Sequence, residues 1–218
     1  LDPRRFYRDE RLLKKGRGAP HLFVSDLDGT LRRDQRFEDE DLEQLRRLEA
    51  RSWVRCVATG RSLYSARQVL PEDFPIDYLV FSSGAGLMHW SDGRLLDSRV
   101  MDTDTLFRVF TAMREMALDF MVHAPVPENH RFEYFQLGEG GTDFLRRLDR
   151  YADYATPGDP KALGLRTASQ LLAVADCSVG PRIVGELRTR LPDVTVVRTT
   201  SPLDGVSTWI EVFPKEVS

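Results

Sequence analysis

The stretch HLFVSDLDGTL, residues 21–31, decides the fold. Its apolar first half reads as a short β-strand, and the letters DLDGT read as a tight turn directly after that strand. Asp26 and Asp28 stand one residue apart at this junction, so the alternation of side chains points both carboxylates towards the same side. An acidic pair in an Asp-Gly turn is by itself ordinary turn chemistry. Whether this pair is more than a turn therefore depends on which other residues the fold places beside it.

Strands and helices alternate in the segment that follows. Between residues 37 and 50, leucines recur every three positions among charges, as on one face of an amphipathic helix. WVRCVAT (53–59) and DYLVFSS (77–83) read as strands, and between them Ser62 can cap a helix that runs to Leu70. This order predicts an α/β fold with right-handed crossovers and a parallel sheet covered on both faces.

Three polar residues follow three of the predicted strands. Asp26, Thr59 and Ser83 each stand at a carboxyl end, although they are far apart in the sequence. Ligands of parallel α/β sheets bind at this edge. We therefore expect one crevice to contain all three residues.

The pattern changes after Ser83. GAGLMHWSDGRLL (84–96) has the turn letters of a β-hairpin, and later runs such as FMVHA, RFEYFQ, QLLAVADC and VTVVRTT are strand-like and interspersed with helical patterns. These runs predict a separate α+β module from about Leu87 to Ser201. The last apolar run, STWIEVF (207–213), is expected to return to the first sheet. RRLDR (146–150) reads as a solvated helix face.

Composition and charge exclude several classes of protein. The chain has 31 basic and 34 acidic residues and a net charge of -3, so no basic excess suggests a nucleic-acid partner. No apolar run is long enough for a membrane-spanning helix, and the charged residues 1–20 lack the apolar stretch of a secretory signal. We expect a cytoplasmic protein whose oligomeric state stays open. Cys56 and Cys177 both lie in apolar runs and are expected to be buried.

Three motifs resemble one family. FVSDLDGTL (23–31) resembles motif I of the haloacid dehalogenase superfamily, and VATGRS (57–62) resembles its motif II. FSSGAGLMHWSDGRLLDSRV (81–100) is similar to the segment that leads into the cap in the Cof-type and sucrose-phosphatase-like branch, with Ser83 where many members have Asn. The resemblance implies a Rossmann-like core with an inserted C2-type cap. The expected division is a charged extension (1–20), the first part of the core (21–86), the cap (87–201) and a truncated return to the core (202–218).

The resemblance also implies a reaction. Asp26 would attack phosphorus to form an aspartyl-phosphate, and Asp28 would act as acid and base. Mg²⁺ would be held by the Asp26 side chain, the carbonyl of Asp28 and a further acid from a fourth motif. Thr59, Gly60 and Arg61 would bind the phosphate, although Arg61 could equally form a salt bridge.

The carboxyl end departs from the family pattern. WIEVFPKEVS (209–218) resembles the approach to motif III, but Lys215 lies too early to be the catalytic lysine and reads as an exposed loop lysine. Motif IV is absent from the sequence. We therefore expect this chain to be weak or inactive by itself, as a fragment of a longer protein rather than a natural pseudoenzyme.

The resemblance favours a small phosphorylated metabolite, preferably a sugar phosphate, as substrate. His123, Glu128, His130 and Arg131 flank a proline-containing loop in the expected cap and are candidate substrate contacts. Two alternatives stay open at this point. One is a phosphomutase-like phosphotransferase, and the other is a non-catalytic module that binds phosphosugars or regulates another enzyme.

Overall fold

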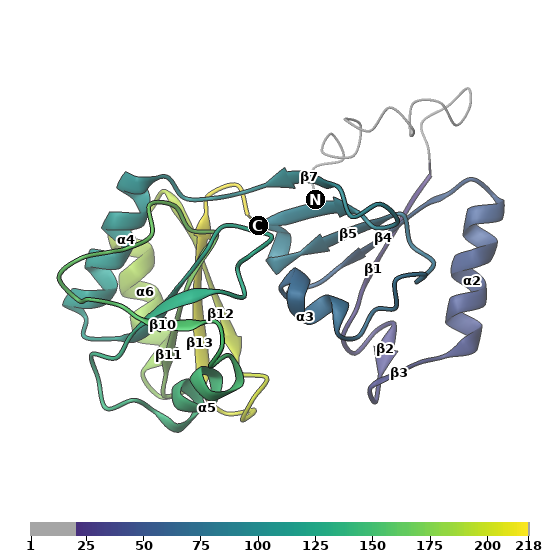
Figure 1. Ribbon diagram of the computed structural model, residues 1–218. Coiled ribbons are helices and arrows are strands. Elements are labelled where there is room, and N and C mark those ends of the chain that lie inside the picture. The colour runs from purple at the N-terminus through teal and green to yellow at the C-terminus, as the bar shows by residue number, and fades with distance from the viewer. Residues whose placement is uncertain (1–20, 218) are drawn as a thin grey trace. The chain divides into compact units, whose positions relative to one another are not determined.

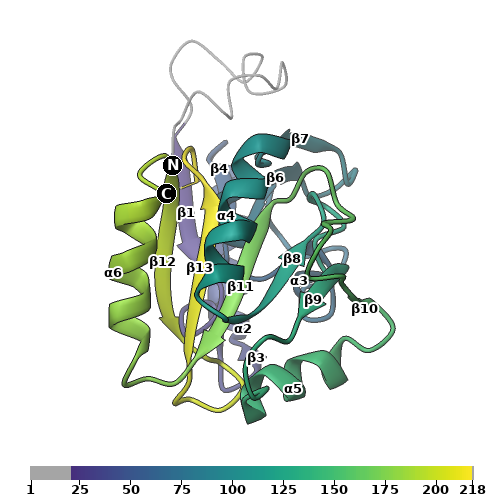
Figure 2. The same cartoon turned by 90° about the vertical axis from the view of Figure 1, so that its left-hand side faces the viewer.

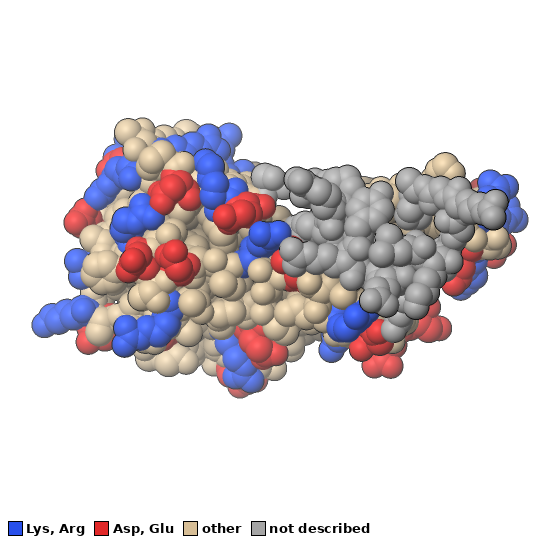
Figure 3. All heavy atoms as spheres, turned by 90° about the horizontal axis from the view of Figure 1, so that it is seen from above, with Lys and Arg blue, Asp and Glu red and all other residues tan. Residues whose placement is uncertain are grey.

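The computed structural model describes residues 21–217, so the predicted charged extension lies outside the described residues. The described residues divide into two compact units, 21–98 and 99–217 (Figure 1). None of the described helices is long and apolar enough to cross a membrane. Acidic and basic side chains are interspersed on the face of the molecule that Figure 3 shows, in keeping with the nearly balanced charge of the chain.

The first unit is built on a five-stranded sheet with the order β1-β4-β5-β6-β7. The first three of these strands are parallel, as the alternation of strands and helices predicts, and the last two are antiparallel. A short β2–β3 hairpin follows the first strand. The elements are β1 (Leu22–Asp26), β2 (Arg32–Arg33), β3 (Arg36–Phe37), α2 (Asp39–Ala50), β4 (Val54–Ala58), α3 (Leu63–Arg67), β5 (Tyr78–Phe81), the 3-10 turn η2 (Ser82–Gly84), β6 (Gly86–His89) and β7 (Leu95–Ser98).

Local sequence explains these elements. Strand β4, the middle one of the three parallel strands, is buried along most of its length and is apolar except for Arg55, as expected for a strand covered on both faces. Helix α2 buries Leu45 from its leucine stripe and leaves its charges outside. The predicted cap of α3 is confirmed, because the Ser62 hydroxyl accepts a hydrogen bond of 3.2 Å from the backbone N–H of Ser65.

The hairpin of β6 and β7 belongs to the first unit, so the predicted module boundary at Leu87 is wrong. β6 pairs with β5, with Val80 opposite Leu87, and Leu87 is fully buried in the same cluster as Val54 and Tyr78. The hairpin extends the first sheet because its apolar face continues that of β5. The compact units divide between Ser98 and Arg99 instead.

The second unit is built on a six-stranded sheet with the order β10-β9-β8-β11-β13-β12. Its strands are antiparallel except for the parallel pair of β9 and β10. The elements are α4 (Thr103–Glu115), β8 (Asp119–His123), β9 (Phe132–Phe135), α5 (Thr142–Arg150), β10 (Ala155–Pro157), β11 (Gln170–Ala175), α6 (Gly180–Arg190), β12 (Val194–Thr200) and β13 (Thr208–Pro214).

The prediction that STWIEVF returns to the first sheet is wrong. This run forms β13, which lies between β11 and β12 in the second unit's sheet. A tight connection causes this: the N–H of Ser201 donates to the carbonyl of Ser207 at 2.7 Å, and the Asp204 carboxylate accepts from the N–H of Ser207 at 2.8 Å. The turn folds β13 back onto β12 as a hairpin. Residues 202–217 therefore extend the second unit and do not form a return to the first sheet.

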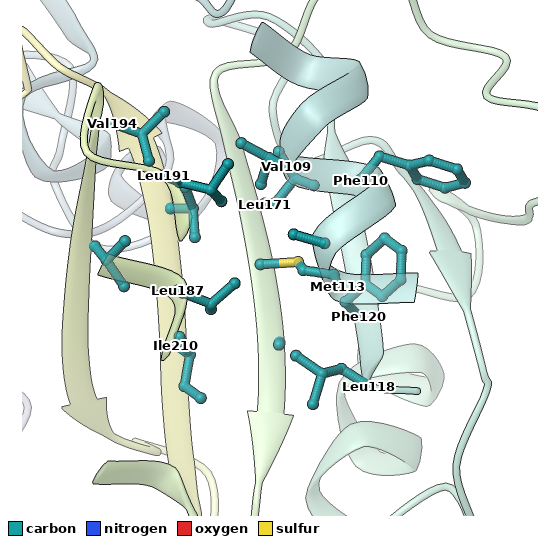
Figure 4. Close-up of a cluster of buried hydrophobic side chains, with 14 of the residues drawn as sticks. Val109, Phe110, Met113, Leu118, Phe120, Leu171, Leu187, Leu191, Val194 and Ile210 are labelled. Atoms are coloured by element: carbon teal, nitrogen blue, oxygen red, sulfur yellow. The ribbon is translucent and has the colours of Figure 1, made fainter. Parts of the chain in front are cut away.

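Helices α4 and α6 cover one face of the six-stranded sheet, where they lie side by side in Figure 2. Apolar side chains from both helices and from five strands form this core, part of which Figure 4 shows. The opposite face is contacted by α5, in a second cluster that contains Met121, Phe132, Phe144, Leu172 and Trp209. The sheet is therefore packed on both faces, but only one face has two helices on it.

The two cysteines differ, and the expectation that both are buried is wrong for Cys177. Cys177 lies exposed in the turn after β11, whereas Cys56 is buried in β4. Burial raises the pKa of the Cys56 thiol to about 12.

Because thiolate is the reactive form, we expect Ellman's reagent at pH 8 to modify Cys177 rapidly and Cys56 only after denaturation. Absorbance should report one fast thiol per native chain, and a Cys177→Ser variant should show none. Two fast thiols in the native protein would contradict the burial of Cys56.

Candidate active site

The parallel strands of the first unit bring the predicted polar residues to one edge of the sheet. Asp26, the last residue of β1, pairs in register with Ala58, and Thr59 follows directly. The N–H of Thr59 donates to the carbonyl of Val80 at 2.9 Å, and the N–H of Ser83 donates to the carbonyl of Thr59 at 3.2 Å. The three strand ends therefore lie next to one another, as the sequence predicts.

Asp26 has an exposed carboxylate. The side chain forms no hydrogen bond or ion pair with any other residue of the described range 21–217. The following residue, Leu27, is fully buried, which fixes the backbone at this position and directs the neighbouring carboxylates of Asp26 and Asp28 away from the core. Asp26 is thus held at a fixed place with both oxygens available.

The Asp28 carboxylate, in contrast, forms hydrogen bonds with another side chain. Its two carboxylate oxygens accept hydrogen bonds from Nε and Nη2 of Arg61 at 2.7 and 2.9 Å, the bidentate arrangement that suits a guanidinium. Arg32 lies 3.7 Å from the same carboxylate. The turn that carries Asp28 depends on Gly29, whose φ of +81° is a conformation that favours glycine.

The sequence leaves two roles open for Arg61, a salt bridge and a ligand contact. In this structure Arg61 forms the salt bridge. Its Nη1 also donates to the hydroxyl of Ser65 at 3.1 Å. Sequence reasoning missed two partners of this network, Arg32 and Ser65. Both lie close in sequence to the motifs, at i+4 from Asp28 and from Arg61, which is the signal that could have identified them.

Thr59 and Gly60 follow β4 and lie at the same edge of the sheet as the two carboxylates. Thr59 is buried, and its hydroxyl oxygen accepts the backbone N–H of Arg61 at 3.2 Å. The N–H of Gly60 donates to no residue in the part of the chain that the structure describes. The hydroxyl hydrogen of Thr59 and the N–H of Gly60 are therefore donors that an anion could use.

Backbone strain marks the third strand end. Ser82 and Ser83 both have positive φ, 52° and 54°, which non-glycine residues rarely adopt. Strain of this kind gathers at functional sites. The letters SSG after β5 indicate a turn, but they do not predict two successive left-handed serines.

The donors at this edge suit magnesium better than a softer metal. The described residues contain no group of three or more His, Cys, Asp or Glu side chains placed to hold a metal ion. They do provide the Asp26 carboxylate and the backbone carbonyl of Asp28, both oxygen donors. Mg²⁺ prefers oxygen ligands, needs only one or two carboxylates from the protein and retains several waters. The residues present therefore fit this ion.

A pocket of about 230 Å³ lies elsewhere in the first unit. It is lined by Phe23 and Leu31 and by residues of α2, including Leu45 and Leu48. None of the carboxylates or donors described above lines it. The candidate site is thus the exposed edge at the strand ends rather than this apolar groove.

Comparison with known proteins decides the family. Residues 23–133, half of the chain, match the family of haloacid dehalogenase-like hydrolases. The chain belongs to this family. The matched segment includes both carboxylates and the Thr59–Arg61 turn. No curated protein sequence gives a significant match to the chain.

Solved structures of this superfamily share the fold. A haloacid dehalogenase-like hydrolase from Bacteroides thetaiotaomicron has 16% identity and a TM-score of 0.64, over 91% of this chain and 73% of that chain. A subclass IIB sugar phosphatase has 15% identity and a TM-score of 0.64, over 91% and 71%. A haloacid dehalogenase-like hydrolase from B. subtilis has 16% identity and a TM-score of 0.64, over 90% and 74%. The predicted family and fold class are confirmed.

The candidate contacts in the second unit of this hydrolase divide into two groups. Glu128, His130 and Arg131 gather around Tyr154: Glu128 lies 3.7 Å from His130 and 3.4 Å from Arg131, and the guanidinium of Arg131 lies 5.3 Å from the Tyr154 ring centroid. Burial lowers the pKa of His130, which favours its neutral form.

His123 is more deeply buried than His130. It is only 1% exposed, and its Nδ1 lies 2.7 Å from the carbonyl oxygen of Asn129, so Nδ1–H is the donor. Burial, with a smaller contribution from the charge of Arg147, lowers its pKa to about 3. The ring is therefore neutral at physiological pH.

Proposed function

We propose that this haloacid dehalogenase-like hydrolase is a Mg²⁺-dependent phosphomonoester hydrolase that forms an aspartyl-phosphate on Asp26. The observation that supports this most is the contrast between the two carboxylates. Asp26 is exposed and has no partner among the described residues, whereas Asp28 is bonded to Arg61. A nucleophile needs available oxygens, and a proton carrier needs a fixed position.

The reaction has two displacements. In the first, an Asp26 oxygen bonds to phosphorus, the bond from phosphorus to the leaving oxygen breaks, and Asp28 gives that oxygen a proton. In the second, Asp28 takes a proton from water as the water oxygen bonds to phosphorus. The bond to Asp26 then breaks and inorganic phosphate leaves.

Asp26 and the carbonyl of Asp28 would hold the metal ion, which supplies positive charge that lets an anionic nucleophile approach an anionic phosphate. Thr59 and Gly60 would donate to the phosphate oxygens from the end of the neighbouring strand β4. Two of the Arg61 nitrogens bond both oxygens of Asp28 in this state, so Arg61 fixes the position of Asp28 and has to release one oxygen before Asp28 can carry a proton. Its Nη1–H bond to Ser65 keeps the guanidinium in that orientation.

We further propose that the second unit, residues 99–217, is the cap that selects the substrate. In the cluster of Glu128, His130 and Arg131, the two charged side chains are exposed and His130 is buried. Such groups suit a small phosphorylated metabolite, and a sugar phosphate is the preferred class. A cytoplasmic location stays a prediction from the sequence.

Substitution of Thr59 tests whether its hydroxyl binds the phosphate. We expect Thr59→Val, which keeps the shape but removes the donor, to lower kcat/KM about 10- to 100-fold. Thr59→Ser should stay within a few-fold of the native value because it keeps the hydroxyl. Phosphate release under subsaturating substrate measures both variants. Full activity of the valine variant would remove Thr59 from the proposed site.

Phosphate release from a panel of sugar phosphates, with and without Mg²⁺, tests the function itself. Release of inorganic phosphate only in the presence of Mg²⁺ supports hydrolysis. Isomerisation of the sugar phosphate without release would indicate a phosphomutase, and binding without turnover would indicate a regulatory module.

A further inference from the structure

Arg32 is a second cation beside the carboxylate of Asp28. Its Nη1 lies 3.7 Å from Oδ1 of Asp28, which is close enough for an ion pair but too long for a hydrogen bond. The guanidinium forms no hydrogen bond with any residue that the structure describes, so its N–H donors are unused. The only acid of the described range with which Arg32 forms an ion pair is Asp28.

The backbone fixes Arg32 next to Asp28. The N–H of Arg32 donates to the carbonyl of Leu27 at 2.8 Å, and the N–H of Gly29 donates to the carbonyl of Arg32 at 2.9 Å. These bonds close the turn that carries Asp28 and pair Arg32 with Asp28 across it. The side chain of Arg32 is 16% exposed, against 47% for that of Arg33, so it lies against the protein rather than in solvent.

Arg61 reaches Asp28 from a different part of the chain, the turn after β4, which lies 33 residues further along the sequence. It bonds both carboxylate oxygens, and the proposed reaction requires it to release one of them. The oxygen nearest to Arg32 is Oδ1, and a carboxylate oxygen has two lone pairs, so Oδ1 can accept from Arg32 as well as from Arg61. A shift of about 1 Å would shorten this ion pair to a charge-assisted hydrogen bond.

We propose that Arg32 is a positioning residue that holds Oδ1 of Asp28 while Arg61 releases Oδ2, so that Oδ2 is the oxygen that carries the proton. This inference rests on the proposed phosphatase reaction. In the first displacement, Oδ2–H gives its proton to the leaving oxygen as the bond from phosphorus to that oxygen breaks, and the carboxylate that results stays bonded to Arg32. In the second, Oδ2 takes a proton from the water whose oxygen bonds to phosphorus. Arg32 itself exchanges no proton.

Two substrates with different leaving groups separate this role from a merely structural one. The sugar oxygen of glucose 6-phosphate needs a proton to leave, whereas the phenolate of p-nitrophenyl phosphate leaves without one. The ratio kcat/KM covers only the steps up to the departure of the leaving group, so it isolates the first displacement. A residue that positions the proton of Asp28 therefore affects kcat/KM for glucose 6-phosphate alone, whereas damage to the fold affects both substrates.

Arg32→Met should lower kcat/KM for glucose 6-phosphate about 10- to 100-fold and that for p-nitrophenyl phosphate less than about threefold. Arg32→Lys should stay within about fivefold of native with both substrates, because a single ammonium is enough to hold one oxygen. Should Arg32→Met fail to fold, Arg32→Gln, which keeps a polar end without the charge, should show a smaller loss of the same selectivity.

Arg36→Met is the matched control for the loss of one positive charge. Arg36 is exposed on the same β2–β3 hairpin and has neither a hydrogen bond nor an ion pair from its side chain to any residue in the described part of the chain. This variant should hydrolyse both substrates at the native rate. Equal losses with both substrates in Arg32→Met, or a loss with neither, would overturn the proposal for Arg32.

Asp28→Asn distinguishes failure of this inference from failure of the proposed function. It should show the same selective loss as Arg32→Met, but a larger one. A selective loss in Asp28→Asn without one in Arg32→Met would refute the role of Arg32 alone. Native hydrolysis of glucose 6-phosphate by Asp28→Asn, or no Mg²⁺-dependent phosphate release by the native chain, would refute the proposed function and this inference with it.

Discussion

Asp26→Asn is expected to lower phosphate release by at least about 10³-fold in the form of the protein that turns over sugar phosphates. The amide keeps the size and the exposed position of the side chain but cannot act as an anionic nucleophile. Because the native carboxylate bonds no other described residue, its replacement should leave the stability of the first unit almost unchanged. The loss would therefore be a loss of chemistry.

Asp73→Asn is a suitable control for the loss of one negative charge. Asp73 is exposed and lies in the turn between α3 and β5, away from the strand ends that carry the site. Its activity should equal that of the native protein. Activity of Asp26→Asn within tenfold of native would exclude Asp26 as the nucleophile, whatever the other variants show.

Phe120→Ala is expected to destabilise the second unit by about 3–5 kcal/mol. Phe120 is fully buried in β8, and its ring centroid lies 4.9 Å from that of Phe135 and 5.7 Å from that of Phe110. Truncation removes one of three mutually contacting rings and leaves a cavity that neighbouring strands cannot fill. Hydrogen exchange followed by mass spectrometry should show faster exchange in β8 and β11.

The same experiment contains its own reference regions. Exchange in β4 and β5 of the first unit should not change, since Phe120 belongs to the core of the second unit. Phe107→Ala on α4 is the matched substitution, because Phe107 is 57% exposed, and its effect should stay within about 0.5 kcal/mol. Similar effects of the two substitutions would contradict the assigned core.

The first unit could be predicted well because its signals are local. The strand, turn and cap letters from Leu22 to Ser62 each determine a few residues at a time, and the rule for parallel sheets brings Asp26 and Thr59 to one edge. The Arg61–Asp28 salt bridge could not be predicted with the same certainty. Both of its possible partners, a carboxylate and a phosphate, suit a guanidinium equally well.

The pairing of β13 could not be predicted because a strand pattern specifies burial but not a partner. The run from Thr208 to Pro214 is mostly apolar and buried, as in a strand covered on both faces, and such a run would fit either sheet. The turn at Asp204 decides the matter by folding the chain back onto β12. Turn geometry of this kind depends on side-chain hydrogen bonds that the letters LDGVS only suggest.

The prediction for Arg147 was wrong for a different reason. The run RRLDR looks like a solvated helix face, and Arg146 and Arg150 do lie exposed. Arg147, however, falls on the stripe of Phe144 and Leu148 that α5 packs onto the sheet. Helical spacing from the buried phenylalanine would have identified it, whereas charge alone suggested solvent.

The most direct test of the account is to trap the intermediate. The form of the protein that releases phosphate should be mixed with its sugar phosphate and Mg²⁺, quenched in acid and reduced with borohydride, which converts an acyl phosphate of aspartate into homoserine. Peptide mass spectrometry should then find homoserine at position 26, and only when substrate and Mg²⁺ are both present. Homoserine at another aspartate, or phosphate release at full rate with none at position 26, would contradict the assignment of Asp26 as the nucleophile.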